Sequence, residues 1–241
     1  MGFLGLFGGS AAEKAKKLKP KVMQKYGDPT VRQKAIAQLG EIKAPEAIAV
    51  LLSRFTVLVD PLTTDSDEKD EVFRLIKARG QDAVKPVQHF LIRSESASSW
   101  ALKLLLALLP EAEVIGIACS LLLDLGKSYS RDPEKKSVLI HYLEGKDDPR
   151  IAASLVPLLE DMSDDIRIAT LRALTPLPSD EIDQPLLKIL GSEDTARRVQ
   201  TAAVAAASAR ALNVQEIRKT LESRMPEGYS VDRAGVLRKR T

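Results

Sequence analysis

The sequence predicts an all-α protein: about six pairs of helices stacked as a right-handed α-α superhelix, then a short C-terminal β-hairpin. Two observations predict this fold. Leu and Ala are abundant while aromatic residues make up 4% of the chain, which suits helices packed through aliphatic side chains. Amphipathic segments of similar pattern also recur every 30 to 40 residues or so. One helical hairpin cannot bury its apolar face alone, so this period is typical of a solenoid.

The clearest repeat unit begins in the stretch SDDIRIATLRAL. Ser163 or Asp164 can cap the first helix, and apolar residues then follow at helical spacing. Pro176 ends this helix because proline cannot continue the hydrogen-bond ladder. A second helix over about 180–190 stops at Gly191, which completes one helical hairpin.

The same unit can be followed along the chain. First helices are expected to begin near residues 29, 68, 97, 133, 164 and 194, and their partners near residues 45, 81, 111, 148, 180 and 213. The solenoid therefore covers residues 28–225. An apolar and basic arm precedes it over 1–27, and a hairpin with a basic tail follows over 226–241.

The first unit carries the pattern Asp-x-x-Val-Arg-x-x-Ala-x-x-x-Leu, which resembles the HEAT repeat, in particular the bacterial HEAT-like or PBS-lyase type. The fifth and sixth units share it in part, whereas the second to fourth lack the Asp and Arg positions. The resemblance implies a polar ladder of Asp and Arg between successive repeats. The residues that match this ladder are Asp28, Arg32, Asp164, Arg167, Asp194 and Arg198.

The segment between the first two units is irregular. Residues 55–59 alternate as in a short extended segment, although they can also continue the preceding helix. Residues 60–71 predict an acidic, solvated loop that caps the next helix. A Ca²⁺ loop is not expected there, because Lys69 and Asp70 occupy positions that an EF-type loop gives to an oxygen ligand and a glycine.

The C-terminal segment predicts a small hairpin. Tyr229 and Val231 on one side, and Val236 and Leu237 on the other, flank a turn in which Gly235 can take a positive φ. Such a hairpin can cover the apolar face of the last repeat. The basic RKR after it is alternatively a contact for an acidic partner or for nucleic acid.

Charge is distributed unevenly along the chain, whose formal net charge is +3. Residues 1–27 hold six lysines and one glutamate, and the tail is also basic, so the solenoid itself is mildly acidic. A groove for a nucleic-acid backbone needs positive charge in the body of the protein. Nucleic acid is therefore not the expected partner.

The arm offers two interpretations. Phe3, Leu4, Leu6 and Phe7 precede the lysines, so the segment can lie on an anionic membrane surface. Alternatively it caps the first repeat or stays a free arm. Its apolar run is too short for a transmembrane helix.

Residues suited to catalysis do not converge in the sequence. His89 and His141 stand in different units, and neither precedes the Glu of the His-Glu pairs that HEAT-repeat iron hydroxylases use. Cys119 is the single cysteine, in an apolar run, which predicts a buried thiol and a reducing compartment. No cofactor and no metal are expected. A DNA-base glycosylase would place several aromatic residues in a cleft, whereas Trp100 is predicted to pack in the core.

These observations predict a cytoplasmic, non-enzymatic scaffold or adaptor that binds another protein through the inner surface formed by the second helices. The alternatives are a nucleic-acid-binding protein or glycosylase-type enzyme, and a membrane-peripheral adaptor that uses the arm. The candidate contact residues on the second helices are Arg54, Lys85, His89, Arg93, Arg150, Lys188, Arg218 and Arg224.

Overall fold

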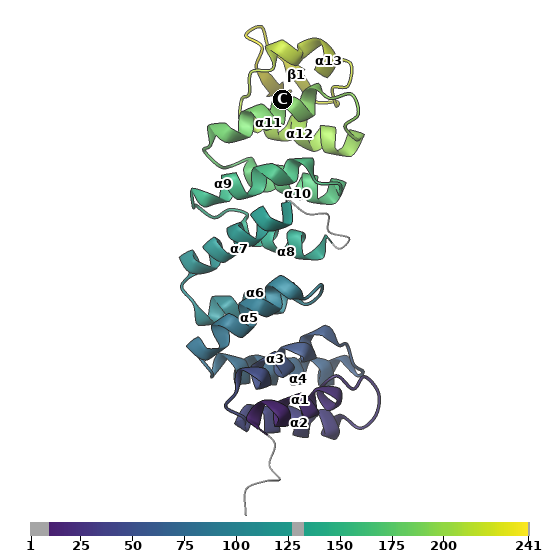
Figure 1. The fold of residues 1–241 in the computed structure, drawn as a ribbon. Helices are drawn as coiled ribbons and strands as arrows, with labels where there is room; N and C mark the ends of the chain where they lie inside the picture. Colours follow the sequence, from purple (N-terminus) through teal and green to yellow (C-terminus); the bar gives the residue numbers. More distant parts are fainter. Residues whose placement is uncertain (1–9, 127–132, 241) are drawn as a thin grey trace, which may run out of the picture. The chain divides into compact units, whose positions relative to one another are not determined.

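The computed structural model describes residues 10–126 and 133–240 (Figure 1). The chain divides into two compact units, residues 1–114 and 115–241, and the boundary falls within helix α7 (Glu111–Gly126). In the described residues, no helix combines the length and the apolar character needed to cross a membrane. Phe3, Leu4, Leu6 and Phe7 lie outside the described residues.

Unit 1 consists of helices joined by short connections. They are α1 (Ala11–Val22), α2 (Pro29–Glu41), α3 (Pro45–Ser53), the 3₁₀ helix η1 (Arg54–Thr56), α4 (Leu62–Lys77), α5 (Gln81–Arg93), α6 (Ser98–Leu108) and the start of α7. The first helices α2, α4 and α6 pack against one another in order, and the second helix α3 packs against α5 (Figure 1). This two-layer stacking of helix pairs is that of a HEAT-like solenoid.

Helix α1 lies within the segment that the sequence predicted as an arm. Ser10 and Glu13 form a reciprocal capping box at its start, which satisfies two backbone N–H groups. Ala15 and Val22 are fully buried, and the helix packs against α2 and α3. The lysines of α1 are exposed, so the helix combines a packed apolar side with a basic solvent-facing side.

A buried charge cluster joins α2, η1 and α4. Glu68 accepts hydrogen bonds from Arg32 at 2.9 and 3.0 Å and from Arg54 at 2.9 Å. Asp65 accepts from Arg54 at 2.8 Å and from Lys69 at 2.7 Å. Burial alone would raise the pKa of Asp65, but the hydrogen bonds from Lys69 and Arg54 outweigh it and hold this pKa below its usual value. We name these five residues the buried charge cluster.

The acidic segment before the second unit differs from the prediction. Residues 62–71 belong to α4, which begins at Leu62, before the predicted start near 68. The reason is tertiary: Asp65 and Glu68 turn inward to the arginines of other elements, so they are not residues of a solvated loop. Residues 54–56 continue α3 as a 3₁₀ helix, and the backbone at Val57 is then extended.

Trp100 is part of a small aromatic group in unit 1. Its ring stacks on Phe55 at a centroid distance of 4.7 Å and lies 6.4 Å from Phe73. The ammonium group of Lys103 lies 4.7 Å from the Trp100 centroid, in a cation–π contact. These contacts give Trp100 a packing role.

Unit 2 contains the end of α7 and further helix pairs. They are α8 (Glu134–Leu143), α9 (Arg150–Leu155) continued by the 3₁₀ helix η2 (Val156–Glu160), α10 (Asp164–Leu174), the 3₁₀ helix η3 (Asp180–Ile182) continued by α11 (Asp183–Gly191), α12 (Arg197–Ala209), the 3₁₀ helix η4 (Gln215–Ile217) and α13 (Arg218–Glu222). First helices α8, α10 and α12 pack in order, and α11 packs against α13. The arrangement of pairs is the same as in unit 1.

A two-stranded antiparallel hairpin ends the chain. Strands β1 (Tyr229–Val231) and β2 (Leu237–Lys239) pair with Tyr229 opposite Lys239, and Gly235 in the turn has φ +83°. Leu237 is fully buried, and β2 packs against α12. The predicted all-α fold with a terminal hairpin is confirmed.

Candidate functional site

Each unit has a groove between two successive second helices. The groove in unit 1, which we call the α3/α5 groove, has a volume of about 710 Å³. Its lining residues are Pro45, Glu46, Ala49, Gln81, Asp82, Val84, Lys85, Pro86 and His89. The lining thus contains proline and aliphatic side chains together with charged groups of both signs.

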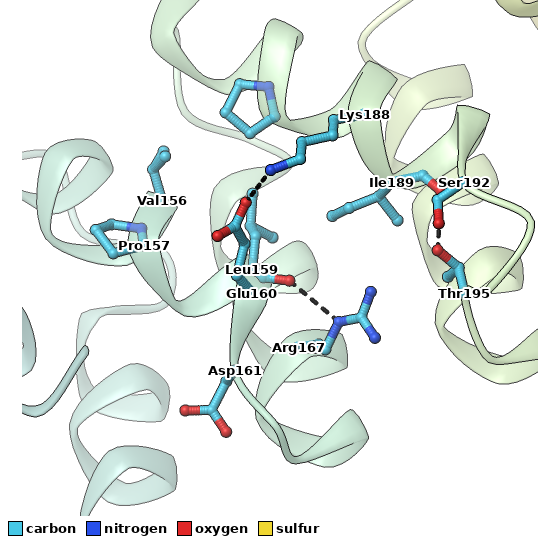
Figure 2. A pocket seen from close by; sticks show the side chains of 11 residues that line it. Val156, Pro157, Leu159, Glu160, Asp161, Arg167, Lys188, Ile189, Ser192 and Thr195 are labelled. Atoms are coloured by element: carbon cyan, nitrogen blue, oxygen red, sulfur yellow. Dashed lines mark hydrogen bonds and ion pairs between the residues drawn. The ribbon is translucent and has the colours of Figure 1, made fainter. Parts of the chain in front are cut away.

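The groove in unit 2 lies between η2 and α11 and has a volume of about 440 Å³; we call it the η2/α11 groove. Its lining residues are Val156, Pro157, Leu159, Glu160, Asp161, Arg167, Pro185, Lys188, Ile189, Ser192 and Thr195. Figure 2 shows Lys188 of α11 reaching across to Glu160 of η2, and the Arg167 guanidinium turned toward the Leu159 carbonyl. The groove therefore has aliphatic walls and a charged rim.

The charged side chains of the η2/α11 groove differ in how strongly ion pairs and hydrogen bonds fix them. Lys188 and Glu160 pair at 2.5 Å, but their side chains are 75% and 69% exposed, so the pair stabilises the fold by at most about 1 kcal/mol. Asp161 is fixed by Lys136, whose ammonium lies 2.6 Å away. Within the described part of the chain, Arg167 donates one hydrogen bond, to the Leu159 carbonyl at 3.1 Å, and lies 3.7 Å from the Asp164 carboxylate. Arg167 is thus the cation of this groove with the most unused hydrogen-bonding capacity.

Three of the predicted contact residues line the two grooves. Lys85 and His89 belong to the α3/α5 groove, and Lys188 belongs to the η2/α11 groove. Arg93 is exposed at the last position of α5. The structure thus places these four side chains at the surface, on second helices of their units.

Arg54 corrects the prediction. Its side chain is 0% exposed, and its guanidinium donates to Glu68, Asp65 and the Val57 carbonyl within the buried charge cluster. A partner at the surface cannot reach it. The physical reason is that a charged residue at the end of a helix is buried when carboxylates from a neighbouring helix neutralise it.

The remaining predicted contact residues serve local structure. Arg218 pairs with Glu222 at 2.8 Å, one turn further along the chain. Arg224 donates to the carbonyls of Ser192 and Thr195, so it fixes the loop before α12. Arg150 pairs with Asp148, as described below.

The predicted Asp and Arg ladder is formed in one place and replaced in another. Arg198 of α12 lies 3.7 Å from Asp164 of α10 and also contacts Asp165, so these side chains join two successive repeats. Asp28 instead caps α2, where it accepts from the Thr30 backbone N–H at 2.9 Å. Arg32, the ladder arginine of the same repeat, pairs with Glu68 in the buried charge cluster. Asp194 is exposed.

The carboxyl group of Asp148 is held by Arg150. The Arg150 guanidinium donates to both carboxylate oxygens, at 2.8 and 2.7 Å, and the Arg150 backbone N–H donates at 3.0 Å. These bonds lower the pKa of Asp148 to about 2. The same contact places the Arg150 guanidinium over α7, where a Cβ at Gly116 would lie 2.6 Å from it.

We expect the Arg150→Ala variant to raise the pKa of Asp148 from its value of about 2, since the first cause of the low pKa, the side-chain hydrogen bond from Arg150, is removed. A folded pKa below the unfolded one stabilises the fold above about pH 4, and this stabilisation is lost as the pH falls toward 2. The variant should therefore lose less stability between pH 4 and pH 2 than the unchanged chain. NMR titration of the Asp148 carboxyl carbon measures the pKa. The control variant Arg218→Ala should leave the pKa of Asp148 unchanged. A pKa still near 2 in Arg150→Ala would show that the Arg150 side chain is not the cause of the low value.

Groups suited to metal binding or nucleophilic chemistry do not converge in the part of the chain that the structure describes. No group of three or more His, Cys, Asp or Glu residues there is placed to hold a metal ion. Burial raises the pKa of the Cys119 thiol, although a hydrogen bond with Ser154 lowers it in part. His141 is exposed, and its Nδ1 lies 2.7 Å from the Ser137 carbonyl.

Comparison with known proteins gives one distant similarity. No protein-family model matches the chain, and no curated protein matches it. Among solved structures, the chain is similar to human deoxyhypusine hydroxylase in complex with glycerol, with 13% sequence identity and a TM-score of 0.38. The match covers 90% of this chain and 91% of that chain.

The prediction of a non-enzymatic scaffold or adaptor is contradicted by this comparison, because the matched protein is an enzyme. We therefore do not retain the scaffold role or the statement that the chain has no enzymatic activity. A similarity of this size does not transfer the activity of the hydroxylase to this chain either.

Proposed function

We propose that the chain binds an extended segment of another protein in the grooves between its second helices. The observation that carries this proposal is the occurrence of the same kind of groove in both units. Each groove joins proline and aliphatic walls to charged side chains of both signs. A repeated, preformed groove suits an extended peptide, because little ordering of the receptor opposes binding.

The η2/α11 groove indicates the chemistry of the segment. Ile189 and Pro185 of α11 and Val156 of η2 offer contact to an aliphatic side chain. Arg167 retains N–H donors for a carboxylate, and a bidentate bond between Arg and carboxylate is among the stronger polar contacts. The weak, exposed pair between Lys188 and Glu160 can open at little cost, so Lys188 can also reach an acidic group. The preferred segment therefore has an acidic residue next to an aliphatic one.

The groove is held open by the fold itself. Leu158 and Leu159 of η2 are buried, and the Lys136–Asp161 pair fixes the end of η2 with both side chains largely buried. On the other wall, Arg224 fixes the loop that carries Ser192 and Thr195. These contacts do not involve the side chains of Arg167 and Lys188, so a peptide that binds those side chains need not break them.

We expect the full chain, panned against a random dodecapeptide display library, to enrich peptides with adjacent acidic and aliphatic residues. Lys188→Glu should weaken their binding about tenfold or more, because it places a second carboxylate beside Glu160 and repels the acidic residue. Fluorescence anisotropy with an enriched peptide measures the dissociation constant.

Lys219→Glu supplies the matched control, since Lys219 is exposed on α13 and lines neither groove. Lys85→Glu tests the α3/α5 groove in the same way. The proposal fails if no peptide is enriched over a blank surface, or if the enriched peptides bind both groove variants as tightly as the unchanged chain.

The proposal includes a location in the cytoplasm. The chain has one cysteine, and Cys119 is buried, which fits a protein that functions in a reducing compartment. We therefore propose a cytoplasmic protein partner. Lipid surfaces and nucleic acids are not needed to explain either groove.

A further inference from the structure

A separate pocket of unit 2 lies beside the N-terminal end of α12. We call it the α12 pocket; its volume is about 580 Å³, and residues of α12 and of the segment after α13 line it. Arg197, Gln200, Arg224, Met225 and Pro226 are among these lining residues. Neither groove described above includes them.

Gln200 is one of the residues that line this pocket, and its buried side chain has an unused hydrogen-bond acceptor. The residue is 1% exposed, and its Nε2 donates to the Leu190 carbonyl at 3.3 Å. Its Oε1 has no hydrogen-bond partner among the described residues. Turning the amide would leave the Leu190 carbonyl without this donor, so the orientation is fixed and the free atom is an acceptor. A buried acceptor without a partner is unfavourable, and proteins usually satisfy such a group with a ligand or an ordered water.

The pocket also presents positive charge. Arg197 is exposed at the first position of α12, and the N-cap residue Ala196 has a methyl side chain, which cannot accept a hydrogen bond from the helix start. The backbone N–H groups of a helix start and its dipole both favour an anion. Arg224 adds a second guanidinium, two of whose nitrogens are held by the carbonyls of Ser192 and Thr195. Glu227 is the acidic residue of the lining, and it disfavours a ligand with more than one negative charge.

A carboxylate alone would satisfy the positive groups but leave the Gln200 acceptor unpaired. A ligand that matches all of these groups has a carboxylate and, on the carbon atom next to it, an N–H donor and an apolar substituent. The apolar substituent would contact Met225 and Pro226. A peptide has this combination at its free carboxyl-terminal residue. We propose that the α12 pocket binds the carboxyl-terminal residue of a peptide, with its carboxylate at Arg197 and its last amide N–H donating to Gln200 Oε1.

Small probes separate the two recognition elements. N-acetyl-leucine has both the carboxylate and the N–H, N-acetyl-leucinamide lacks the carboxylate, and 4-methylpentanoate lacks the N–H. We expect N-acetyl-leucine to bind the full chain with a roughly millimolar dissociation constant and the other two about tenfold more weakly. NMR shift changes of the amides at the start of α12 report binding. Equal binding of all three probes, or no binding of N-acetyl-leucine, would overturn the proposal.

Two variants test which residue recognises the carboxylate and which recognises the N–H group. Arg197→Gln should remove the preference for N-acetyl-leucine over its amide, while Gln200→Met should remove the preference over 4-methylpentanoate. Arg172→Gln on exposed α10 surface is the matched control and should bind like the unchanged chain. Arg197 is exposed, so its variant remains informative even if Gln200→Met does not fold. Unchanged preferences in Arg197→Gln would refute the assignment.

Two further measurements identify the source of the ligand and separate this site from the grooves. Gly-Gly-Gly-Leu with a free carboxylate should bind at least as tightly as N-acetyl-leucine; weaker binding would indicate a free acylated amino acid and contradict the peptide assignment. Lys188→Glu should leave N-acetyl-leucine binding unchanged, because Lys188 does not line the α12 pocket. The groove proposal and this one can therefore fail independently.

Discussion

Replacing Glu68 by alanine is expected to destabilise unit 1 by about 3–5 kcal/mol, the range typical when one partner of a buried ion pair is removed. Glu68 accepts from Arg32 and from Arg54, and both arginine side chains are at most 1% exposed. Without this carboxylate, two guanidinium groups remain buried with fewer partners, and water cannot reach them easily. The large cost is thus the uncompensated charge and not the lost contact alone.

Urea denaturation followed by circular dichroism measures this loss, and amide exchange in α2 and α4 localises it to unit 1. Glu71→Ala is the matched control, since Glu71 lies on the same helix and pairs with Arg74, whose side chain is 67% exposed. That exposed pair should contribute no more than about 1 kcal/mol. Equal effects of the two replacements would show that the buried charge cluster does not hold unit 1 together.

Replacing Leu237 by alanine is expected to destabilise unit 2 by about 2–5 kcal/mol, as for other fully buried leucines. Leu237 is 0% exposed, β2 packs against α12, and the Leu237 backbone N–H donates to the Leu212 carbonyl at 3.0 Å. The truncation leaves a cavity between the hairpin and α12. The α12 face that includes Ala203, Val204 and Ala207 would then be less well shielded from water.

Lys239→Ala supplies the comparison on the same strand, because Lys239 is exposed and its truncation should change the free energy of unfolding by no more than about 0.5 kcal/mol. Urea denaturation of both variants gives the difference, and amide exchange in α12 shows whether the helix opens with the hairpin. A Leu237→Ala variant as stable as Lys239→Ala would mean that the hairpin does not cap the last repeat.

Helix positions could be predicted because their signals are local. The starts of α2, α3, α5, α8 and α10 fall within one residue of the positions that apolar spacing, prolines and capping residues indicated. Helix α1 was missed, although Ser10 and Glu13 carry a capping-box signal, because residues 1–27 were interpreted as one apolar and basic arm. That signal could have found it.

The candidate site could be predicted only in part. Lys85, His89 and Lys188 were found because they are polar residues of second helices, and the grooves lie between those helices. Arg167 was assigned to the repeat ladder, and its position in the η2/α11 groove depends on how α10 packs against η2. The unpaired Oε1 of Gln200 has no signature in the sequence, since satisfaction of a polar atom is a property of its surroundings.

The sequence by itself determined the all-α class, the pairing of helices and the terminal hairpin. The spacing of apolar residues and the backbone preferences of proline and glycine are local, so they can be recognised without knowing the tertiary contacts. The tertiary structure alone decided which charged residues are buried. Arg54 and Glu68 are 14 residues apart and Arg32 and Glu68 are 36 apart, so their pairing arises only when helices stack. Hydrophobic spacing specifies which face of a helix is covered, but the neutralisation of a buried charge requires a partner from another element.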